Sequence, residues 1–171
     1  MDADGARNRH SEAMVDDRSR AFLVAARTAT LATIAPSGRP RLVPICFVVG
    51  EDDPAGRLRI YSPLDEKAKA IADPHRLARV RDVLARPEAT LLIDRWSEDW
   101  DRLAWLRLET SADLLDPSAH GAAGGHEREH SDAIAGLRTK YPQYAGHRLE
   151  VRPVLRFTVQ RVVAWGALGA D

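Results

Sequence analysis

A set of six basic residues has the types and spacing that suit the binding of a phosphate group: Arg41, Lys67, Lys69, Arg76, Arg79 and Arg81. Lys67 and Lys69 are two positions apart in an extended segment, so their side chains share one side. Arg76 and Arg79 are three positions apart, which is the spacing of neighbours on a helix face. Arginine meets a phosphate with a planar fork and lysine with a point charge. The set therefore predicts a site for a phosphate-bearing ligand.

Two plainer interpretations of these residues stay open. The basic cluster could be a solvent-exposed helix face whose partners are Glu66 and Asp82, and Arg41 could be an ordinary surface residue of a sheet. A flat ring system bound beside the cations would need an apolar slot with few polar groups. Candidates for its walls are the strand residues Val43 and Ile45 and the tryptophans at positions 96, 100, 105 and 165. For each tryptophan, packing in the core or between subunits is the alternative.

A second chemical pattern is His126-Glu-Arg-Glu-His130, which has the H-E-x-x-H form of zinc enzymes. Two histidines four positions apart on one helix face can bind zinc, and the intervening glutamate can act as a general base. A third ligand is needed, and neither His120 nor His147 stands at a recognised spacing. We therefore predict no metal site. Tyr61 could donate a proton to a bound substrate, although packing is the more usual role, and the sequence leaves the catalytic residues unknown.

The segments that must position these residues are mostly short strands. Hydrophobic patterns and turn residues predict strands over about 29–35, 41–49, 58–62, 89–96, 103–115 and 154–164, and helices over about 11–27, 74–86 and 126–140. Ser11 could cap the first helix, and Asp73-Pro74 has the composition of a helix start. Leu77, Val80 and Leu84 form the expected buried stripe of the second helix. Pro44 predicts an edge position or a bulge.

This order of elements predicts a protein that is mainly β with flanking helices, a six-stranded split β-barrel. We expect residues 1–10 to be a flexible N-terminal tail and residues 11–168 to form a single domain. The 25 basic and 25 acidic residues balance, so nothing draws the chain as a whole toward nucleic acid or membrane. Cys46 is the only cysteine, which excludes an intramolecular disulfide, and no apolar signal or membrane segment is present. We therefore expect a cytoplasmic protein.

Several segments in order resemble the FMN-binding split-barrel superfamily, the pyridoxamine 5′-phosphate oxidase-like proteins. They are TATLATIAPSGRPRLVPICFVV, IYSPLDEKAK, RPEATLLID, DWDRLAWLR and KYPQY, which together span roughly residues 20–166. The closer resemblance is to the branch that uses the deazaflavin coenzyme F-420. The chain ends in Trp165 and Gly166 rather than in the Arg-Leu-His-type segment of the vitamin oxidases, which disfavours pyridoxamine phosphate as its substrate.

The resemblance implies a homodimer with cofactor sites at the subunit interface. It implies that Arg41, Ser62, Lys67 and Lys69, with Arg79 more weakly, meet the cofactor phosphate. The main chain of Val43, Pro44, Ile45 and Cys46 would lie beside the ring system, and Trp105 and Trp165 are candidates for ring contact. The longer segment between Lys69 and Pro87 departs from the family pattern.

These observations lead to one expected function and two alternatives. We expect a coenzyme F-420-dependent oxidoreductase that transfers hydride to a small unsaturated substrate. The alternatives are an FMN-dependent flavin reductase or oxidase, and a non-catalytic protein that binds a flavin or a tetrapyrrole. Basic residues beyond the phosphate site, such as Arg76 and Arg95, mildly favour F-420, because its oligoglutamate tail adds negative charge.

Overall fold

A computed structural model of the chain describes residues 9–12, 15–64, 73–117 and 124–169. Its strands are β1 (Arg9–Glu12), β2 (Ala29–Ile34), β3 (Pro40–Ile45), β4 (Val48–Val49), β5 (Arg59–Pro63), β6 (Glu88–Arg95), β7 (Ala104–Leu115) and β8 (Val154–Gly166). Its α-helices are α1 (Asp17–Ala25), α2 (Ala78–Ala85) and α3 (Gly124–Lys140). Short 3₁₀ turns lie at Pro74–Arg76, Trp100–Arg102, Pro142–Gly146 and Leu149–Val151.

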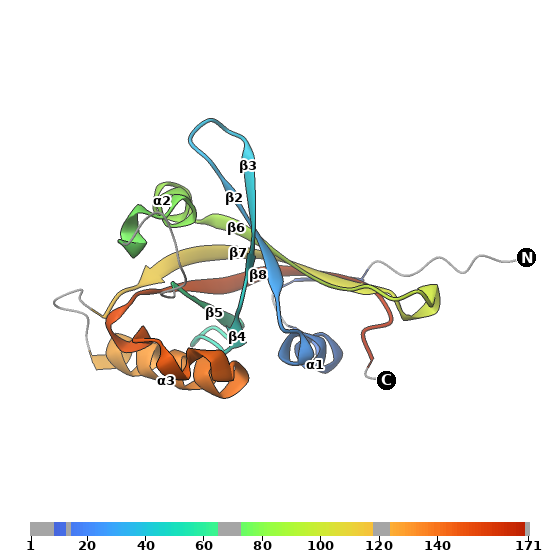
Figure 1. The fold of residues 1–171 in the computed structure, drawn as a ribbon. Coiled ribbons are helices and arrows are strands. Elements are labelled where there is room, and N and C mark those ends of the chain that lie inside the picture. The colour runs from blue at the N-terminus through green and yellow to red at the C-terminus, as the bar shows by residue number, and fades with distance from the viewer. Residues whose placement is uncertain (1–8, 13–14, 65–72, 118–123, 170–171) are drawn as a thin grey trace, which may run out of the picture.

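The strands form one curled antiparallel sheet in the order β3-β2-β6-β7-β8-β5-β4, and β1 pairs with β8 (Figure 1). Strands β3 and β4 are therefore the two ends of this path, although they are neighbours in the sequence. The long strands β7 and β8 pair along their lengths, from Ala104 opposite Gly166 to Leu115 opposite Val154. This pair forms the centre of the sheet.

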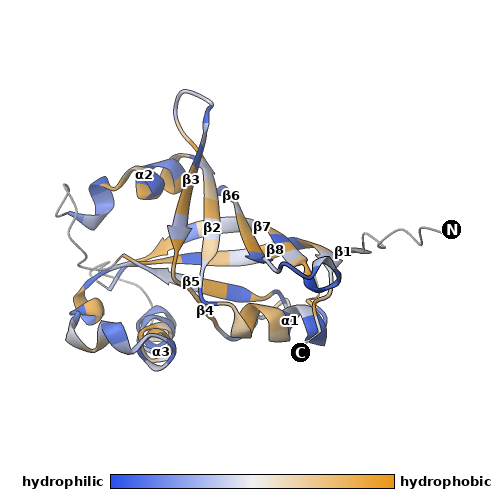
Figure 2. Ribbon diagram, turned by 45° about the vertical axis from the view of Figure 1, so that its right-hand side comes forward, coloured by the Kyte–Doolittle hydropathy of each residue, from blue (hydrophilic) through white to orange (hydrophobic). Residues whose placement is uncertain are grey.

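Alternation of apolar and polar residues explains which face of each strand is buried (Figure 2). In β7, the alternate residues Ala104, Leu106 and Leu108 are buried, as the sequence predicts, and they join the main core inside the curled sheet. Phe157 of β8 is fully buried in the same core. Helix α2 contributes Val80 to this core.

A second, smaller core lies on the outer side of the sheet, beneath α3. Leu137 of α3 is fully buried there with Tyr61 of β5, Tyr141 and Tyr144. Helix α3 therefore covers the outer face of β4 and β5, on the side of the sheet away from α2 (Figure 1). On the outer face of β2, β3 and β6, neither core covers the described residues, and Leu42 and Leu92 are 65% and 38% exposed there.

Several predicted boundaries differ from the structure. In the described part of the chain, the sheet has eight strands and not the expected six, because the expected strand 41–49 is divided into β3 and β4, and because β1 forms near the N-terminus. The first helix begins after Asp16, whose carboxylate accepts a hydrogen bond from Ser19 N at 2.7 Å, so Ser11 is not its cap. In α2, Val83 is buried and Leu84 is 61% exposed, because the helix begins one turn later than expected, after the 3₁₀ turn.

Other predictions agree with the structure or lie beyond it. Pro44 is on the edge strand β3, as expected. Most of the expected tail, residues 1–10, lies outside the described residues, but Arg9 and His10 belong to β1. Within the described part of the chain, no helix combines the length and the apolar character needed to cross a bilayer.

Candidate functional site

Asp82 connects α2, which carries Arg79, to β2 and to Arg41 of β3. Asp82 of α2 is buried and accepts hydrogen bonds from Arg41 Nε at 2.7 Å and from Thr33 Oγ1 at 2.9 Å. Arg79 lies three positions before Asp82, which places it on the same face of α2. Asp82 thus holds the Arg41 side chain at its Nε. Among the described residues, the terminal guanidinium nitrogens of Arg41 have no such partner.

Of the other expected phosphate ligands, Ser62, Lys67 and Lys69, the structure describes only Ser62. Ser62 is 1% exposed and lies on β5 opposite Leu155, on the inward face that it shares with Ile60 and Leu64. Lys67 and Lys69 lie outside the described residues. In the sequence, the segment that carries them connects β5 to the turn before α2.

The segment from Val43 to Cys46 forms the open edge of the sheet. Val43 and Ile45 pack inward against the main core, whereas Pro44 is exposed and Cys46 contacts the second core. Ala35 N donates to Arg39 O at 2.9 Å, and the same register pairs Leu31 with Val43. Because antiparallel ladders alternate, the main-chain groups of Leu42 and Pro44 point away from β2, toward the open edge.

The two candidate tryptophans form a pair of their own. Trp105 on β7 and Trp165 on β8 are cross-strand partners whose rings stack, with centroids 6.4 Å apart and an interplanar angle of 17°. Strands β2 and β6 separate this pair from β3 within one chain. The structure therefore does not bring Trp105 and Trp165 beside Val43 and Ile45. Trp96 and Trp100, at 70% and 74% exposed, stand on the connection between β6 and β7.

The H-E-x-x-H motif lies on α3 but does not form a metal site in the described part of the chain. His130 is 5% exposed, and its Nε2 is 2.8 Å from the carbonyl oxygen of Arg152. His126 is exposed. No group of three potential metal ligands is found among the described residues. The second histidine of the motif is therefore used to fix α3 to the segment before β8.

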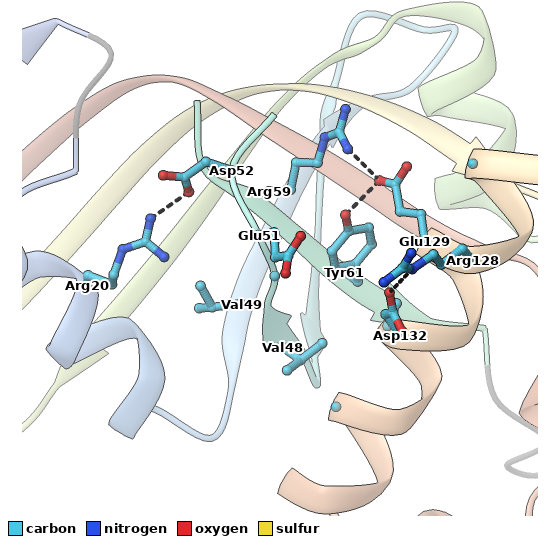
Figure 3. A pocket seen from close by; sticks show the side chains of 14 residues that line it. Arg20, Val48, Val49, Glu51, Asp52, Arg59, Tyr61, Arg128, Glu129 and Asp132 are labelled. Atoms are coloured by element: carbon cyan, nitrogen blue, oxygen red, sulfur yellow. Dashed lines mark hydrogen bonds and ion pairs between the residues drawn. The ribbon is translucent and has the colours of Figure 1, made fainter. Parts of the chain in front are cut away.

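Glu129, inside the same motif, has a role that the sequence analysis missed. Its Oε1 accepts a hydrogen bond from Tyr61 Oη at 2.6 Å and lies 3.1 Å from Arg59 Nη1 (Figure 3). Its Oε2 accepts a hydrogen bond from Arg156 Nη1 at 2.9 Å. Arg156 also donates two hydrogen bonds to Asp113, at 2.9 and 2.6 Å. Arg59, Tyr61 and Arg156 come from β5 and β8, so only the paired strands bring them together under α3. No local sequence signal marks this network.

The charges of this network determine the protonation of its members. Burial alone would raise the pKa of Glu129, but the hydrogen bonds from Tyr61 and Arg156 and the nearby positive charges outweigh burial and lower it. Burial and the bond to Glu129 raise the pKa of the Tyr61 phenol. Tyr61 is therefore a fixed hydrogen-bond donor to an ionised carboxylate, which argues against its use as the proton donor of a reaction.

Next to this network is a cavity of about 720 Å³, enclosed by α1, the β4–β5 hairpin and α3 (Figure 3). It is lined by Arg20, Val48, Val49, Gly50, Glu51, Asp52, Arg59, Tyr61, Gly125, Arg128, Glu129, Asp132, Ala133 and Gly136. Of the residues singled out from the sequence, Tyr61 lines this cavity, and none of the expected cofactor-binding residues does. The cavity was not predictable, because its walls come from three segments that are distant in the sequence.

Lys140 is a further residue that the sequence analysis missed. Its Nζ lies 4.2 Å from the ring centroid of Phe47 and 5.7 Å from that of Tyr141. This nitrogen is buried, and it has no hydrogen-bond partner among the described residues. Burial, followed by the positive charge of Arg27, lowers the pKa of Lys140 to about 8. An amine that titrates near neutral pH therefore lies beside Phe47, the residue after Cys46.

Replacing Lys140 with methionine is expected to stabilise the protein at pH 7 by about 1 kcal/mol, since a desolvated charge is removed at the loss of a cation–π contact. The folded-state pKa lies below the unfolded one, so wild-type stability should rise as the pH increases from 8 to 10. The gain from Lys140→Met should shrink over the same range. Urea unfolding at pH 7, 8.5 and 10 would measure this. Lys140→Arg, which stays charged, should give no gain, and a gain that is independent of pH would contradict the assignment.

The profile of the pyridoxamine 5′-phosphate oxidase family matches residues 15–166. No curated protein sequence matches the chain significantly. Among solved structures, a conserved hypothetical protein from Mycobacterium tuberculosis is similar with a TM-score of 0.63 and 17% identity, over 94% of this chain and 89% of that one. The haem storage protein HutZ from Vibrio cholerae has a TM-score of 0.59 and 13% identity, over 90% of this chain and 97% of that one.

An F-420 reductase is also similar, with a TM-score of 0.54 and 14% identity, over 86% of this chain and 95% of that one. At these identities the likenesses show a shared fold and nothing further. The family profile covers nearly the whole chain, including every strand from β2 to β8. The protein belongs to the pyridoxamine 5′-phosphate oxidase family.

Proposed function

We propose that this protein is an oxidoreductase that binds the deazaflavin coenzyme F-420 along the edge of β3 and uses it to reduce a small unsaturated substrate. The observation that carries the proposal is the combination of an open strand edge with a guanidinium group held in place beside it. Membership of the family supports a flavin-type cofactor, and the likeness to an F-420 reductase supports this branch.

The edge of β3 fits the flat ring of a flavin-type cofactor. The pyrimidine part of such a ring carries alternating N–H and C=O groups. The main-chain N–H and C=O of Leu42 and the C=O of Pro44 point out of the sheet at this edge. The Leu42 side chain is 65% exposed and offers apolar surface next to these groups. The segment thus combines a few polar groups with an apolar wall, as ligand sites usually do.

The phosphate end of the cofactor would meet the cations around α2. Arg41 is anchored through its Nε by Asp82, so its terminal nitrogens can present a fork to a phosphate with little loss of side-chain entropy. Arg79 stands on the same face of α2, and Lys67 and Lys69 are proposed to complete the set. When bound, the cofactor supplies the hydride, and this chain's own residues orient the ring and exclude water.

We also propose that the protein is a homodimer with the cofactor site at its subunit interface. On the uncovered face of the sheet, Thr30 lies between Pro44 and Leu92 in neighbouring strands, and Leu92 is 38% exposed. A second subunit placed on this face would bury these residues and enclose the edge of β3. Within one chain Trp105 and Trp165 do not lie beside Val43 and Ile45, so in the proposed dimer the second subunit would provide the aromatic residues of the site.

Two alternatives make different predictions. FMN shares the ribityl phosphate with F-420, so the same residues would serve an FMN-dependent reductase or oxidase. A protein that stores a flavin or a tetrapyrrole would bind its ligand without turnover, and the likeness to a haem storage protein keeps this alternative in view.

Titration of cofactor-free protein with F-420 and with FMN, followed by fluorescence at low salt, would test the proposal. We expect F-420 to bind more tightly than FMN by about tenfold or more, because its tail adds charge that the basic residues can meet. Preference for FMN would favour the first alternative, and binding of neither would overturn the cofactor proposal. Turnover of reduced F-420 with a panel of conjugated acceptors would then separate an enzyme from a storage protein.

Replacing both Lys67 and Lys69 with alanine is expected to weaken F-420 binding by about a hundredfold, if each lysine makes a charge-assisted contact with the phosphate. The matched control is Arg18→Ala, which removes a positive charge from an exposed position on α1. The control should leave the affinity nearly unchanged. Unchanged affinity in the lysine variant would place the phosphate site elsewhere.

A further inference from the structure

The cavity between α1, the β4–β5 hairpin and α3 has charged walls whose charges do not balance. Three of its arginines have carboxylate partners in the wall itself: Arg20 with Asp52 at 2.5 Å, Arg59 with Glu129 at 3.1 Å and Arg128 with Asp132 at 3.9 Å. These pairs neutralise one another. The remaining charged residue of the wall is Glu51, so the lining carries one negative charge in excess.

Glu51 is free to bind a ligand. It is exposed, it lies two residues after the end of β4, and its side chain has no ion pair or hydrogen bond with any other residue that the structure describes. Glu129, by contrast, is held by three donors and is 14% exposed, so it has little capacity left. The acceptor that the cavity offers to an incoming cation is therefore the Glu51 carboxylate (Figure 3).

The rest of the lining is suited to an apolar body. Val48 faces α3 and the second core, on the side where Ala133 and Gly136 line the cavity, whereas Val49, the next residue of β4, packs against the main core. At Gly136 a Cβ atom would approach Val48 Cγ2 to 3.1 Å, so the apolar part of the lining lies where β4 packs closely on α3. The volume of about 720 Å³ lies in the usual range of small-molecule sites.

We propose that this cavity binds an organic cation, an amine carried on an apolar body, with the ammonium group at Glu51 and the body against Val48 and Ala133. The site shares no residue with Arg41, Ser62 or Arg79, so it does not depend on the proposed cofactor function. A neutral molecule of the same shape would lack the contact with Glu51. An anion would face the excess negative charge and bind least well.

Isothermal titration calorimetry with three probes of the same body tests the proposal: 4-phenylbutylamine, 4-phenylbutanol and 4-phenylbutyrate. For the wild-type protein we expect the amine to bind about tenfold more tightly than the alcohol, since charge-assisted hydrogen bonds are the stronger ones. The methyl NMR signals of Val48 should shift on addition of the amine. Absence of amine binding, or equal affinity for amine and alcohol, would overturn the proposal.

Two variants test the role of Glu51. Glu51→Gln keeps the shape of the side chain, and because this residue is exposed the variant should retain wild-type stability within about 0.5 kcal/mol. In it, the preference for the amine over the alcohol should fall to about twofold or less. Glu98→Gln, at an exposed position between β6 and β7, is the matched control and should keep the full preference. A preference that survives Glu51→Gln would contradict the assignment of the ammonium contact.

Discussion

Replacing Glu129 with alanine is expected to destabilise the protein by about 2–4 kcal/mol, because removing one partner of a buried ion pair leaves the other charges uncompensated. Glu129 is 14% exposed, and its partners Arg59 and Arg156 are 24% and 15% exposed. Arg156 keeps Asp113 after the substitution, whereas Arg59 and Tyr61 lose this partner. Urea unfolding at pH 7 measures the effect.

Two further variants separate the loss of the Glu129 charge from the loss of its hydrogen bonds and from a general effect on α3. Glu129→Gln keeps the shape and can still accept hydrogen bonds, so it should cost about half as much as the alanine variant, the difference being the charge. Glu127→Ala removes an exposed carboxylate two positions earlier on α3 and should change the stability by less than about 0.5 kcal/mol. If Glu127→Ala and Glu129→Ala destabilised equally, the loss would reflect the helix and not the network.

The Glu129 network also predicts how the stability of the folded protein changes as the pH falls. The pKa of Glu129 lies below its ordinary value of 4.5, so the folded state binds this proton less readily than the unfolded state does. The stability that Glu129 contributes is complete above the unfolded pKa and is lost as the pH falls through the lower, folded pKa. The stability difference between wild type and Glu129→Gln should therefore narrow below pH 4.5. A difference that stays constant into acid would contradict this.

Gly166→Ala is expected to destabilise the protein by about 3 kcal/mol or more, through backbone strain and a steric clash. Gly166 ends β8 with φ of +83°, and a Cβ there would lie 2.0 Å from Leu103 O and 2.9 Å from Ala104 Cα. These atoms belong to the backbone, so they cannot move aside as a flexible side chain would. Because Trp165 precedes Gly166, the near-ultraviolet circular dichroism of the Trp105–Trp165 stack should change as well.

Gly38 provides a control for the backbone conformation alone. It has φ of +80°, close to that of Gly166, but a Cβ there would meet no atom within 4 Å. Gly38→Ala should therefore cost only about 1 kcal/mol, the contribution of the positive φ. The difference between the two variants measures the clash with Leu103 and Ala104. Equal losses would show that the end of β8 relaxes freely.

The strands could be predicted well where one face is buried and the other is solvated. Ala104, Leu106 and Leu108 are buried at alternate positions of β7, so the period of two is visible in the sequence. The segment 41–49 is apolar at nearly every position, and its pattern does not reveal that the ladder stops after Ile45 and resumes as β4. The start of α2 was less predictable, because the turn at Pro74–Arg76 delays the helix and turns Leu84 outward.

The residues of the sites were harder to predict than the fold. The sequence predicts Arg41 as a phosphate ligand. It does not predict the hydrogen bond from Arg41 to Asp82, because that bond depends on how α2 packs against β2 and β3. The partners of Glu129 lie 68 and 27 positions away in the chain, so no local pattern records them. The spacing of the histidines in the H-E-x-x-H motif is typical of a zinc site. The residue of this motif at the centre of the charged network is Glu129, which the spacing does not indicate. Long-range pairing of β5 with β8 creates the network, and the packing of α1 and α3 around the β4–β5 hairpin creates the cavity.

The prolines of β3 also protect the protein against aggregation. An exposed strand edge is a template on which another chain can extend the sheet. Pro40 and Pro44 occupy positions whose main-chain groups point outward at this edge, and neither has an N–H group to donate. A strand added there would find a donor only at Leu42 within β3, so sheet growth would leave carbonyl groups unpaired. The edge at which we propose that a cofactor ring binds is thereby a poor partner for a second strand.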